Sequence, residues 1–160
     1  MSKAKEMLGI LAQEGLTLGS VESLTGGLFA ATVCEVPGAS RVFSGALVTY
    51  DPRLKSELAY VNEASIKLKG VVSADVAVQM AEGGAKRMGV DVCVSCTGNA
   101  GPTTEPGGEP VGRVFLGLSY NGYSWTVPLL LEGDRQKIRE QTVENMMDLV
   151  ISLFTVHNNS

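Results

Sequence analysis

Ser23, Thr25, Gly26 and Gly27 stand together in the stretch VESLTGGL, where an apolar strand pattern gives way to small apolar residues. Two interpretations of Ser23 stay open at this point. A serine at a strand-to-helix junction most often caps the helix. It can also be a nucleophile, held at a turn whose backbone amides stabilise a developing anion. The second interpretation needs a base and a ligand-binding loop elsewhere in the chain.

A base for this serine is not expected to be a histidine. His157 is the only histidine and stands close to the C-terminus, which disfavours Ser-His-Asp and Cys-His catalysis and weakens any transition-metal site. The stretch VTYDPRLK instead offers Tyr50 at a strand end and Lys55 about one turn into the next helix. A helix N-terminus disfavours an ammonium and so helps to lower the pKa of Lys55. A neutral lysine can take the proton from a serine hydroxyl.

A third polar segment, TGNAGP at residues 97–102, also begins where a strand is expected to end. Its glycines let backbone amides approach a ligand closely, as in an anion-binding nest or an oxyanion hole. Two arginines one turn apart at the start of the last helix suit a phosphate. Each feature alone is more often a turn or a solvated charge, but together they occupy successive strand ends. The residues expected to bind substrate are Thr25, Gly26, Gly27, Thr97, Gly98, Asn99, Gly101, Arg135 and Arg139.

The elements that carry these segments alternate between strands and helices. Apolar periodicity, cap residues and the Asn121-Gly122 hairpin signal define them. We therefore expect a three-layer α/β/α fold with a mixed, mostly parallel central sheet and one antiparallel edge. Ligands bind outside the carboxyl ends of strands in such sheets, where Ser23, Tyr50 and Thr97 would meet. The expected helices are 3–14, 25–36, 52–58, 74–88 and 134–154, and the expected strands are 16–21, 43–50, 90–97, 112–120 and 123–131.

Length and composition favour a single domain over residues 1–160. A chain of 160 residues buries a sizeable core. A mean hydropathy of +0.14 and the lack of an apolar run of roughly 20 residues disfavour disordered and membrane proteins. The net charge of −4 provides no basic face for nucleic acid. The N-terminal residues do not resemble a secretory signal.

The three cysteines do not indicate a disulfide framework, and a reducing cytoplasm is the expected location. Cys93 and Cys96 form a C-x-x-C pattern within an expected buried strand, where residues three apart point to opposite faces. Neither a redox pair nor half of a zinc site fits that geometry. We expect two small core residues, and no metal.

Several segments, in their order and near their spacing, resemble the C-terminal domain of CinA proteins, which also exists alone as nicotinamide-nucleotide amidase. The matching segments are VESLTGG, ALVTYDPRLK, GVVSADVAVQMAEG, TGNAGP, EPVGRV and EGDRQKIR, from about residue 5 to residue 154. Any one of them is weak, whereas the ordered set is specific. The N-terminal nucleotide-handling domain of full-length CinA has no counterpart in this sequence, so the resemblance points to the stand-alone form.

The resemblance implies a hydrolase that converts nicotinamide mononucleotide to nicotinate mononucleotide and ammonia in pyridine-nucleotide salvage. The E-S-x-T-G-G motif implies a nucleophile at Ser23. The T-Y-x-x-x-x-K motif implies a base at Lys55, with Tyr50 nearby. No cofactor or metal is implied, and the expected partner is the small nucleotide substrate rather than nucleic acid or a membrane. The apolar last helix suggests a homo-oligomer.

The sequence also departs from the family pattern. Asn99 stands where Ile is usual and adds a polar group to the expected ligand loop, so the departures bear on substrate fit more than on the nucleophile. Two alternatives stay open: a non-catalytic nucleotide-binding or regulatory module with the same fold, and an amidase for another small carboxamide. The intact serine and lysine favour the enzyme. The other departures are Leu24 for Cys, Asp51-Pro52 for Ser-Asn and Arg113 for Thr.

Overall fold

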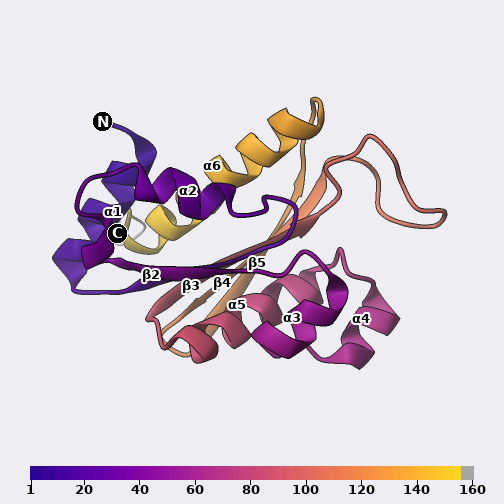
Figure 1. Ribbon diagram of the computed structural model, residues 1–160, viewed down its shortest axis with the longest axis horizontal. Helices are drawn as coiled ribbons and strands as arrows, with labels where there is room; N and C mark the ends of the chain where they lie inside the picture. Colours follow the sequence, from indigo (N-terminus) through magenta and orange to yellow (C-terminus); the bar gives the residue numbers. More distant parts are fainter. Residues whose placement is uncertain (156–160) are drawn as a thin grey trace.

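A five-stranded sheet forms the middle layer of the computed structural model, in the order β2-β1-β3-β4-β5 (Figure 1). The structure describes residues 1–155, and His157 lies outside them. β1 pairs in parallel with β2 and β3, whereas β3–β4 and β4–β5 are antiparallel. The predicted fold class is confirmed. The strands are β1 (Leu18–Glu22), β2 (Phe43–Val48), β3 (Val92–Gly98), β4 (Arg113–Tyr120) and β5 (Tyr123–Leu130).

Helices cover both faces of the sheet (Figure 1). One face carries α1 (Lys3–Glu14), α2 (Leu28–Cys34) and α6 (Arg135–Thr155), and the other carries α3 (Pro52–Ala59), α4 (Glu63–Lys69) and α5 (Ala74–Met88). Side chains alternate between the two resulting cores, because successive residues of a strand point to opposite faces. Cys96 belongs to the core under α6 and Cys93 to the core under α5. The prediction that the side chains of these two cysteines lie on opposite faces of the sheet is confirmed.

Two glycines let α5 lie unusually close to its neighbours, and this sets the position of α3. A Cβ at Gly83 would collide with the carbonyl of Ala59 in α3. A Cβ at Gly117 of β4 would collide with the carbonyl of Ala77 in α5. Larger residues would push these backbones apart. The close packing therefore holds α3, which carries Lys55, against the ends of the strands.

Most element boundaries lie near their predicted positions, and α5 matches the predicted 74–88. The predicted start of α2 at Thr25 is wrong. Gly26 and Gly27 have φ of 57° and 102°, so the chain makes a turn first and the helix begins at Leu28. The helix α4 was not predicted, because its segment EASIKLK buries no residue and so shows no apolar periodicity.

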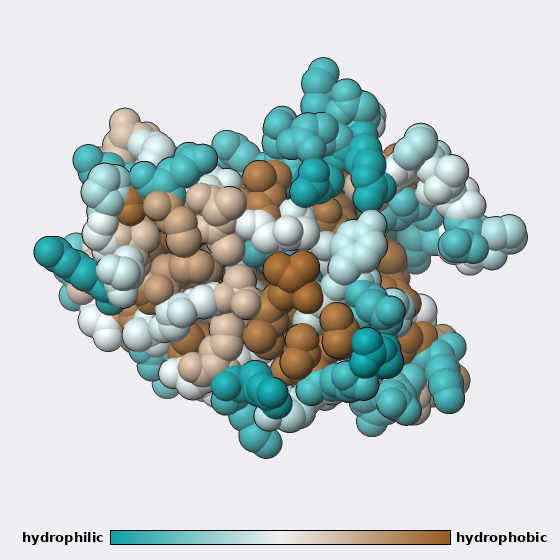
Figure 2. Space-filling view, viewed as in Figure 1, coloured by the Kyte–Doolittle hydropathy of each residue, from teal (hydrophilic) through white to brown (hydrophobic). Residues whose placement is uncertain are grey.

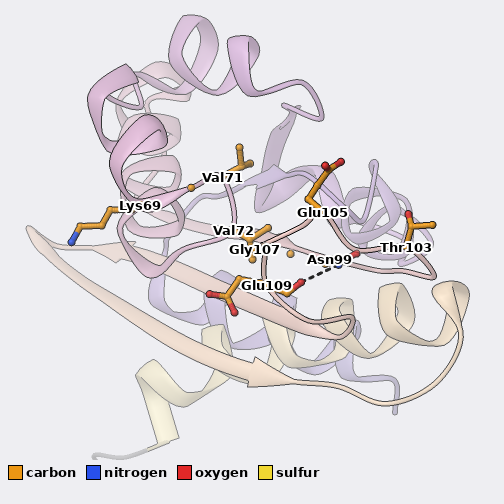
Figure 3. A pocket seen from close by; sticks show the side chains of 11 residues that line it. Lys69, Val71, Val72, Asn99, Thr103, Glu105, Gly107 and Glu109 are labelled. Carbon is orange, nitrogen blue, oxygen red and sulfur yellow. Dashed lines mark hydrogen bonds between the residues drawn. The ribbon is translucent and has the colours of Figure 1, made fainter.

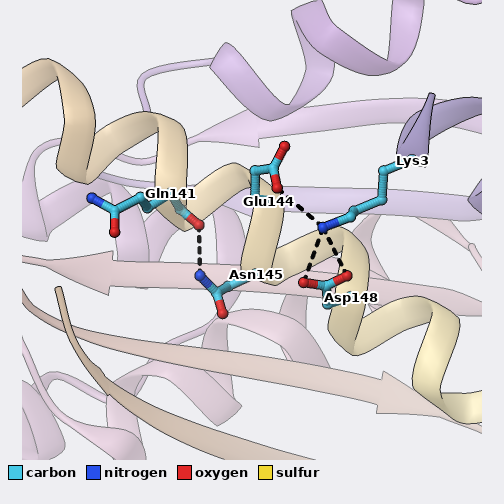
Figure 4. Close-up of polar contacts among 5 residues, drawn as sticks. All are labelled: Lys3, Gln141, Glu144, Asn145 and Asp148. Atoms are coloured by element: carbon cyan, nitrogen blue, oxygen red, sulfur yellow. Dashed lines mark hydrogen bonds and ion pairs between the residues drawn. The ribbon is translucent and has the colours of Figure 1, made fainter.

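An ion-pair cluster joins the first helix to the last. The amine of Lys3 lies 3.0 Å from a carboxylate oxygen of Glu144 and 3.0 Å from one of Asp148 (Figure 4). Hydrogen bonds with both carboxylates raise the pKa of Lys3. The apolar side of α6, with Met146 and Val150, is buried in the core of the same chain. It therefore gives no ground for a homo-oligomer, which stays a prediction.

The strand β2 forms one edge of the sheet. Figure 2 shows the molecule in the same view as Figure 1. Apolar side chains lie in the middle of the surface seen there, over β2, with hydrophilic side chains around them. Within residues 1–155, no helix has the length and apolar character needed to cross a membrane.

Candidate active site

The amine of Lys55 lies against the hydroxyl of Ser23, the residue that directly follows β1. Nζ donates hydrogen bonds to Ser23 Oγ at 3.0 Å and to the carbonyl of Thr49. Asp51 caps α3 and Pro52 occupies its first turn, as the sequence predicts. Since helical side chains lean toward the N-terminus of their helix, this start directs Lys55 back to the strand ends.

Both groups are shielded from water, because Lys55 is 0% exposed and Ser23 is 8% exposed. Burial lowers the pKa of Lys55 from 10.5 to about 8, although Cys96 and Asp51 oppose the shift. The main cause is therefore removal from water, rather than the helix N-terminus that the sequence suggests. None of the ion pairs within residues 1–155 involves Lys55. A share of the amine is thus uncharged near neutral pH.

Three strand ends meet here, as the sequence predicts. Among these three strands, β1 lies between β2 and β3. Ser23 follows β1, Tyr50 comes after β2, and Thr97 lies near the end of β3. Tyr50 is 60% exposed and marks the open side of the site. The Thr97 hydroxyl donates to the carbonyl of Val71 at 2.9 Å and so holds the connection before α5. A cavity of about 210 Å³ is lined by Ser23, Leu24, Tyr50, Val71, Thr97, Gly98, Asn99, Ala100 and Arg135.

Thr25, Gly26 and Gly27 form the turn that carries Ser23, and they do not line this cavity. The amide of Gly26 donates to the Ser23 carbonyl at 3.0 Å. The hydroxyl of Thr25 donates to Glu22 at 2.7 Å and lies 3.2 Å from the thiol sulfur of Cys96. These groups are therefore engaged within the protein. Contacts of residues 25–27 with a substrate stay a prediction.

The two predicted arginines have different surroundings. Arg139 donates from Nε and Nη2 to the carbonyls of residues 24 and 25, each at 2.9 Å, and so holds the turn. Arg135 donates to the carbonyl of Gly101 at 2.7 Å and to the hydroxyl of Tyr50 at 3.1 Å. Only Arg135 lines the cavity. It is the better placed of the two to meet an anionic group of a ligand, whereas substrate contacts of Arg139 and Gly101 stay predictions.

A long loop over residues 99–112 projects from the sheet (Figure 1) and borders a second cavity of about 580 Å³ (Figure 3). Asn99 joins the two ends of this loop. Its Nδ2 donates to the carbonyl of Glu109 at 3.3 Å, and its Oδ1 accepts from the amide of Gly101 at 2.9 Å. Val71, Gly98 and Asn99 line both cavities, which therefore adjoin. The unusual polar group at position 99 thus shapes the loop.

Two residues in or beside the site, Val71 and Glu22, were not predicted from the sequence. Val71 lies in the connection after α4, a helix that was itself missed. Glu22 directly precedes Ser23 and is fully buried; a carboxylate at an inward-facing strand position was its signal. Within residues 1–155, no group of three or more His, Cys, Asp or Glu side chains is arranged to hold a metal ion.

Comparisons with known sequences show which family the chain belongs to. Residues 1–154 match the CinA C-terminal domain family. A CinA-like protein of Dictyoglomus turgidum is 42% identical over 144 residues, which cover 90% of this chain and 35% of that protein. A putative competence-damage inducible protein of Limosilactobacillus fermentum is 44% identical over 151 residues, covering 93% and 36%. The chain thus spans about a third of the length of these curated relatives.

Solved structures show the same fold. The competence/damage inducible protein CihA from Agrobacterium tumefaciens superposes with a TM-score of 0.90 at 31% identity, covering 94% of this chain and 93% of that one. A CinA superfamily protein from Escherichia coli gives a TM-score of 0.92 at 26% identity, with 95% and 88% covered. Because the family match extends over nearly the whole chain, the protein belongs to the CinA C-terminal domain family.

Proposed function

We propose that this domain is an amidohydrolase that deamidates nicotinamide mononucleotide to nicotinate mononucleotide with release of ammonia. The proposal rests on one observation, the 3.0 Å contact between a fully buried Lys55 amine and the hydroxyl of Ser23. Burying a lysine without a carboxylate partner destabilises a protein. Such a group beside a cavity is typical of a catalytic site. The names of the relatives refer to competence and damage and do not state a reaction.

In the proposed first half-reaction, neutral Lys55 accepts the Ser23 proton while Oγ attacks the carboxamide carbon. The Oγ–C bond forms, and the carbonyl π electrons move to oxygen. The tetrahedral intermediate then collapses, the C–N bond breaks, and the Lys55 ammonium gives its proton to the departing amide nitrogen. Ammonia leaves, and Ser23 remains as an ester of the nicotinate group.

The amide of Gly98 is the donor best oriented for the oxyanion. Asn99 donates its amide to Arg113 at the β4 side. Since successive amides of a strand point to opposite edges, the Gly98 amide points to the β1 side, beyond whose end Ser23 lies. Gly98 also lines the cavity. A donor held by a sheet needs little reorganisation when charge develops.

The second half-reaction uses the same groups in reverse roles. A water molecule gives a proton to neutral Lys55 and attacks the ester carbon. Collapse of the second intermediate breaks the Oγ–C bond, and the Lys55 ammonium returns its proton to Ser23 Oγ. The product leaves as the carboxylic acid, which loses its proton to solvent and becomes the carboxylate, and the enzyme is restored.

The substrate proposal follows from the size and charge of the site. A cavity of about 210 Å³ suits the pyridine ring and its carboxamide and leaves ribose and phosphate toward the open side. The positive ring withdraws electrons from the carboxamide, which helps a modest nucleophile. Arg135 is the cation at this cavity and is proposed to meet the phosphate. Binding energy from such a remote group can orient the carboxamide.

Ammonia release tests the proposal, with nicotinamide mononucleotide, nicotinamide riboside and free nicotinamide assayed side by side. The mononucleotide is expected to react fastest. Ser23→Ala should abolish turnover but keep substrate binding and folding, because it removes one hydrogen bond with the Lys55 amine, worth about 0.5–1.5 kcal/mol. Lys55→Arg should be inactive, because a guanidinium stays charged.

The possible results separate the alternatives. If Ser23→Ala keeps most of its activity, Ser23 is only a structural residue. If the wild type binds the mononucleotide and releases no ammonia from any substrate, the domain is a non-catalytic nucleotide-binding module. Equal turnover of mononucleotide and riboside would remove the phosphate role of Arg135 while leaving the serine chemistry in place.

A further inference from the structure

Glu22 is a fully buried carboxylate that the proposed mechanism does not use. It is the last residue of β1 and directly precedes Ser23. Because strand side chains alternate, Glu22 points to the α2 side of the sheet and Ser23 to the α3 side, toward Lys55. None of the ion pairs within residues 1–155 involves Glu22. The carboxylate is therefore stabilised by neutral hydrogen-bond donors.

Four donors converge on this carboxylate. Oε1 accepts from the hydroxyl of Thr25 at 2.7 Å and from the amide of Phe29 at 3.0 Å. Oε2 accepts from the amide of Ala30 at 3.1 Å and from the hydroxyl of Ser20 at 3.3 Å. Hydrogen bonds to a carboxylate are stronger than neutral ones, and burial strengthens them further. Three of the donors follow Ser23 in the chain, so Glu22 closes the turn that carries the serine.

Apart from Glu22, the turn is held by two backbone hydrogen bonds within it and by two hydrogen bonds from Arg139. Gly26 and Gly27 have positive φ of 57° and 102°, and glycine loses more conformational freedom on folding than other residues. The N-cap of α2 is Gly27, which has no side chain to cap the helix. Glu22 replaces that missing cap from the neighbouring strand, since it accepts from the first-turn amides of α2.

We propose that Glu22 is a positioning residue for the nucleophile: its carboxylate fixes residues 23–30 and so sets Ser23 Oγ against Lys55 Nζ. Glu22 acts through Thr25 and the start of α2 and touches no reacting atom. The inference rests on the proposed function in so far as Ser23 is taken as the nucleophile. The stabilisation of this turn by Glu22 can be measured without catalysis.

Glu22→Gln tests the proposal with little change of size. One of its two terminal atoms becomes an NH2 group, which cannot accept from an amide or a hydroxyl. We expect kcat for ammonia release to fall about 10- to 100-fold, since a misplacement of about 1 Å can cost about 100-fold, while KM stays within about threefold. The pH at which the rate rises should not move, because Lys55 lies on the other face of β1.

Ser20→Ala is the matched control. It removes the longest of the four bonds, at 3.3 Å, and leaves the three donors that follow Ser23. This variant should keep kcat within about twofold. Thr25→Val is a milder second variant, expected to lower kcat by an intermediate factor, with the Glu22→Gln/Thr25→Val double variant close to Glu22→Gln alone because the two share one interaction. Additive losses would overturn the proposal.

Amide hydrogen exchange gives a readout that does not depend on turnover. Residues 24–30 should exchange about tenfold faster in Glu22→Gln than in Ser20→Ala, with α5 unchanged in both. If the wild type releases no ammonia, the proposed function fails and the exchange result still decides whether Glu22 holds the turn. Wild-type exchange in residues 24–30, or a kcat per folded molecule within twofold of wild type, would overturn the inference.

Discussion

At the residue scale, the proposed chemistry depends on one amine. Lys55 must be neutral to accept the Ser23 proton, and burial lowers its pKa to about 8. We therefore expect kcat/KM for the mononucleotide to rise with pH through about 8 and to level off above it. Initial rates of ammonia release from pH 6 to 10 measure this. A profile without a rise near pH 8 would mean that another group is the base.

The same burial affects stability. A lysine with a lower pKa in the folded state binds fewer protons when folded, so stability should rise with pH between about 8 and 10.5. Below pH 8 the full destabilisation is present, about 3 kcal/mol at about 1.4 kcal/mol per pH unit. Lys55→Met should therefore raise the Tm at pH 7, by an amount that shrinks toward pH 10.

Lys67→Met is the control for this comparison, since Lys67 is exposed on α4. It should show no gain that depends on pH. Thermal unfolding at several pH values measures both variants. If Lys55→Met is less stable than the wild type at pH 7, the hydrogen bonds of the amine outweigh its burial.

Part of this site can be predicted from sequence because strand ends concentrate ligand-binding residues. Ser23, Tyr50 and Thr97 follow or end apolar strands, so their neighbourhood in space follows from the α/β topology. Glu22 stands out only as a carboxylate at an inward-facing strand position, and its role follows from hydrogen-bond partners that the sequence pattern does not reveal. Arg139 reaches a carbonyl 115 residues away in the chain, and no local pattern reveals such a partner.

At the element scale, the turn between β1 and α2 requires glycine. Gly27 has φ of 102°, a conformation that L side chains rarely adopt. Gly27→Ala is expected to lower the free energy of unfolding by about 1–2 kcal/mol and to slow ammonia release, because this turn carries Ser23. Gly9→Ala makes the same chemical change within α1, where nothing lies within 4 Å of the new methyl group. It should raise the free energy of unfolding by about 0.5–1 kcal/mol.

Urea unfolding and kcat, measured on both glycine variants, test whether the free energy of unfolding falls in Gly27→Ala and rises in Gly9→Ala. A Gly27→Ala protein with wild-type stability would show that the turn tolerates another backbone path. A loss of stability in Gly9→Ala would show that α1 is limited by packing rather than by helix propensity.

Elements with strong local signals are also those that the sequence predicts well. Ser73 accepts from the amide of Val76 and starts α5 as predicted. Asn121 and Gly122 have φ of 53° and 80°, as the turn of a tight hairpin requires. The start of α2 was missed because it depends on the φ angles of two glycines. α4 was missed because an exposed helix lacks apolar periodicity.

At the scale of the whole molecule, an acidic chain surrounds a site with a cation. The net charge is −4, yet Arg135 lines the cavity beside Ser23. A local positive group can bind a small anion even when the overall charge gives no long-range attraction. This arrangement suits a single small anionic ligand better than a polyanion such as DNA.

The whole chain also bears on whether the reaction needs a metal ion. In the proposed mechanism, Lys55 makes the proton transfers at the reacting atoms, and the Gly98 amide stabilises the oxyanion. Burial raises the pKa of Cys93 to about 12 and that of Cys96 to about 11, so neither thiol is a ready thiolate ligand near neutral pH. We expect ammonia release to survive exhaustive dialysis against EDTA, with a zinc hydrolase treated in parallel as the control. Loss of activity that a divalent ion restores would contradict the serine–lysine mechanism, whatever the Ser23 and Lys55 variants show.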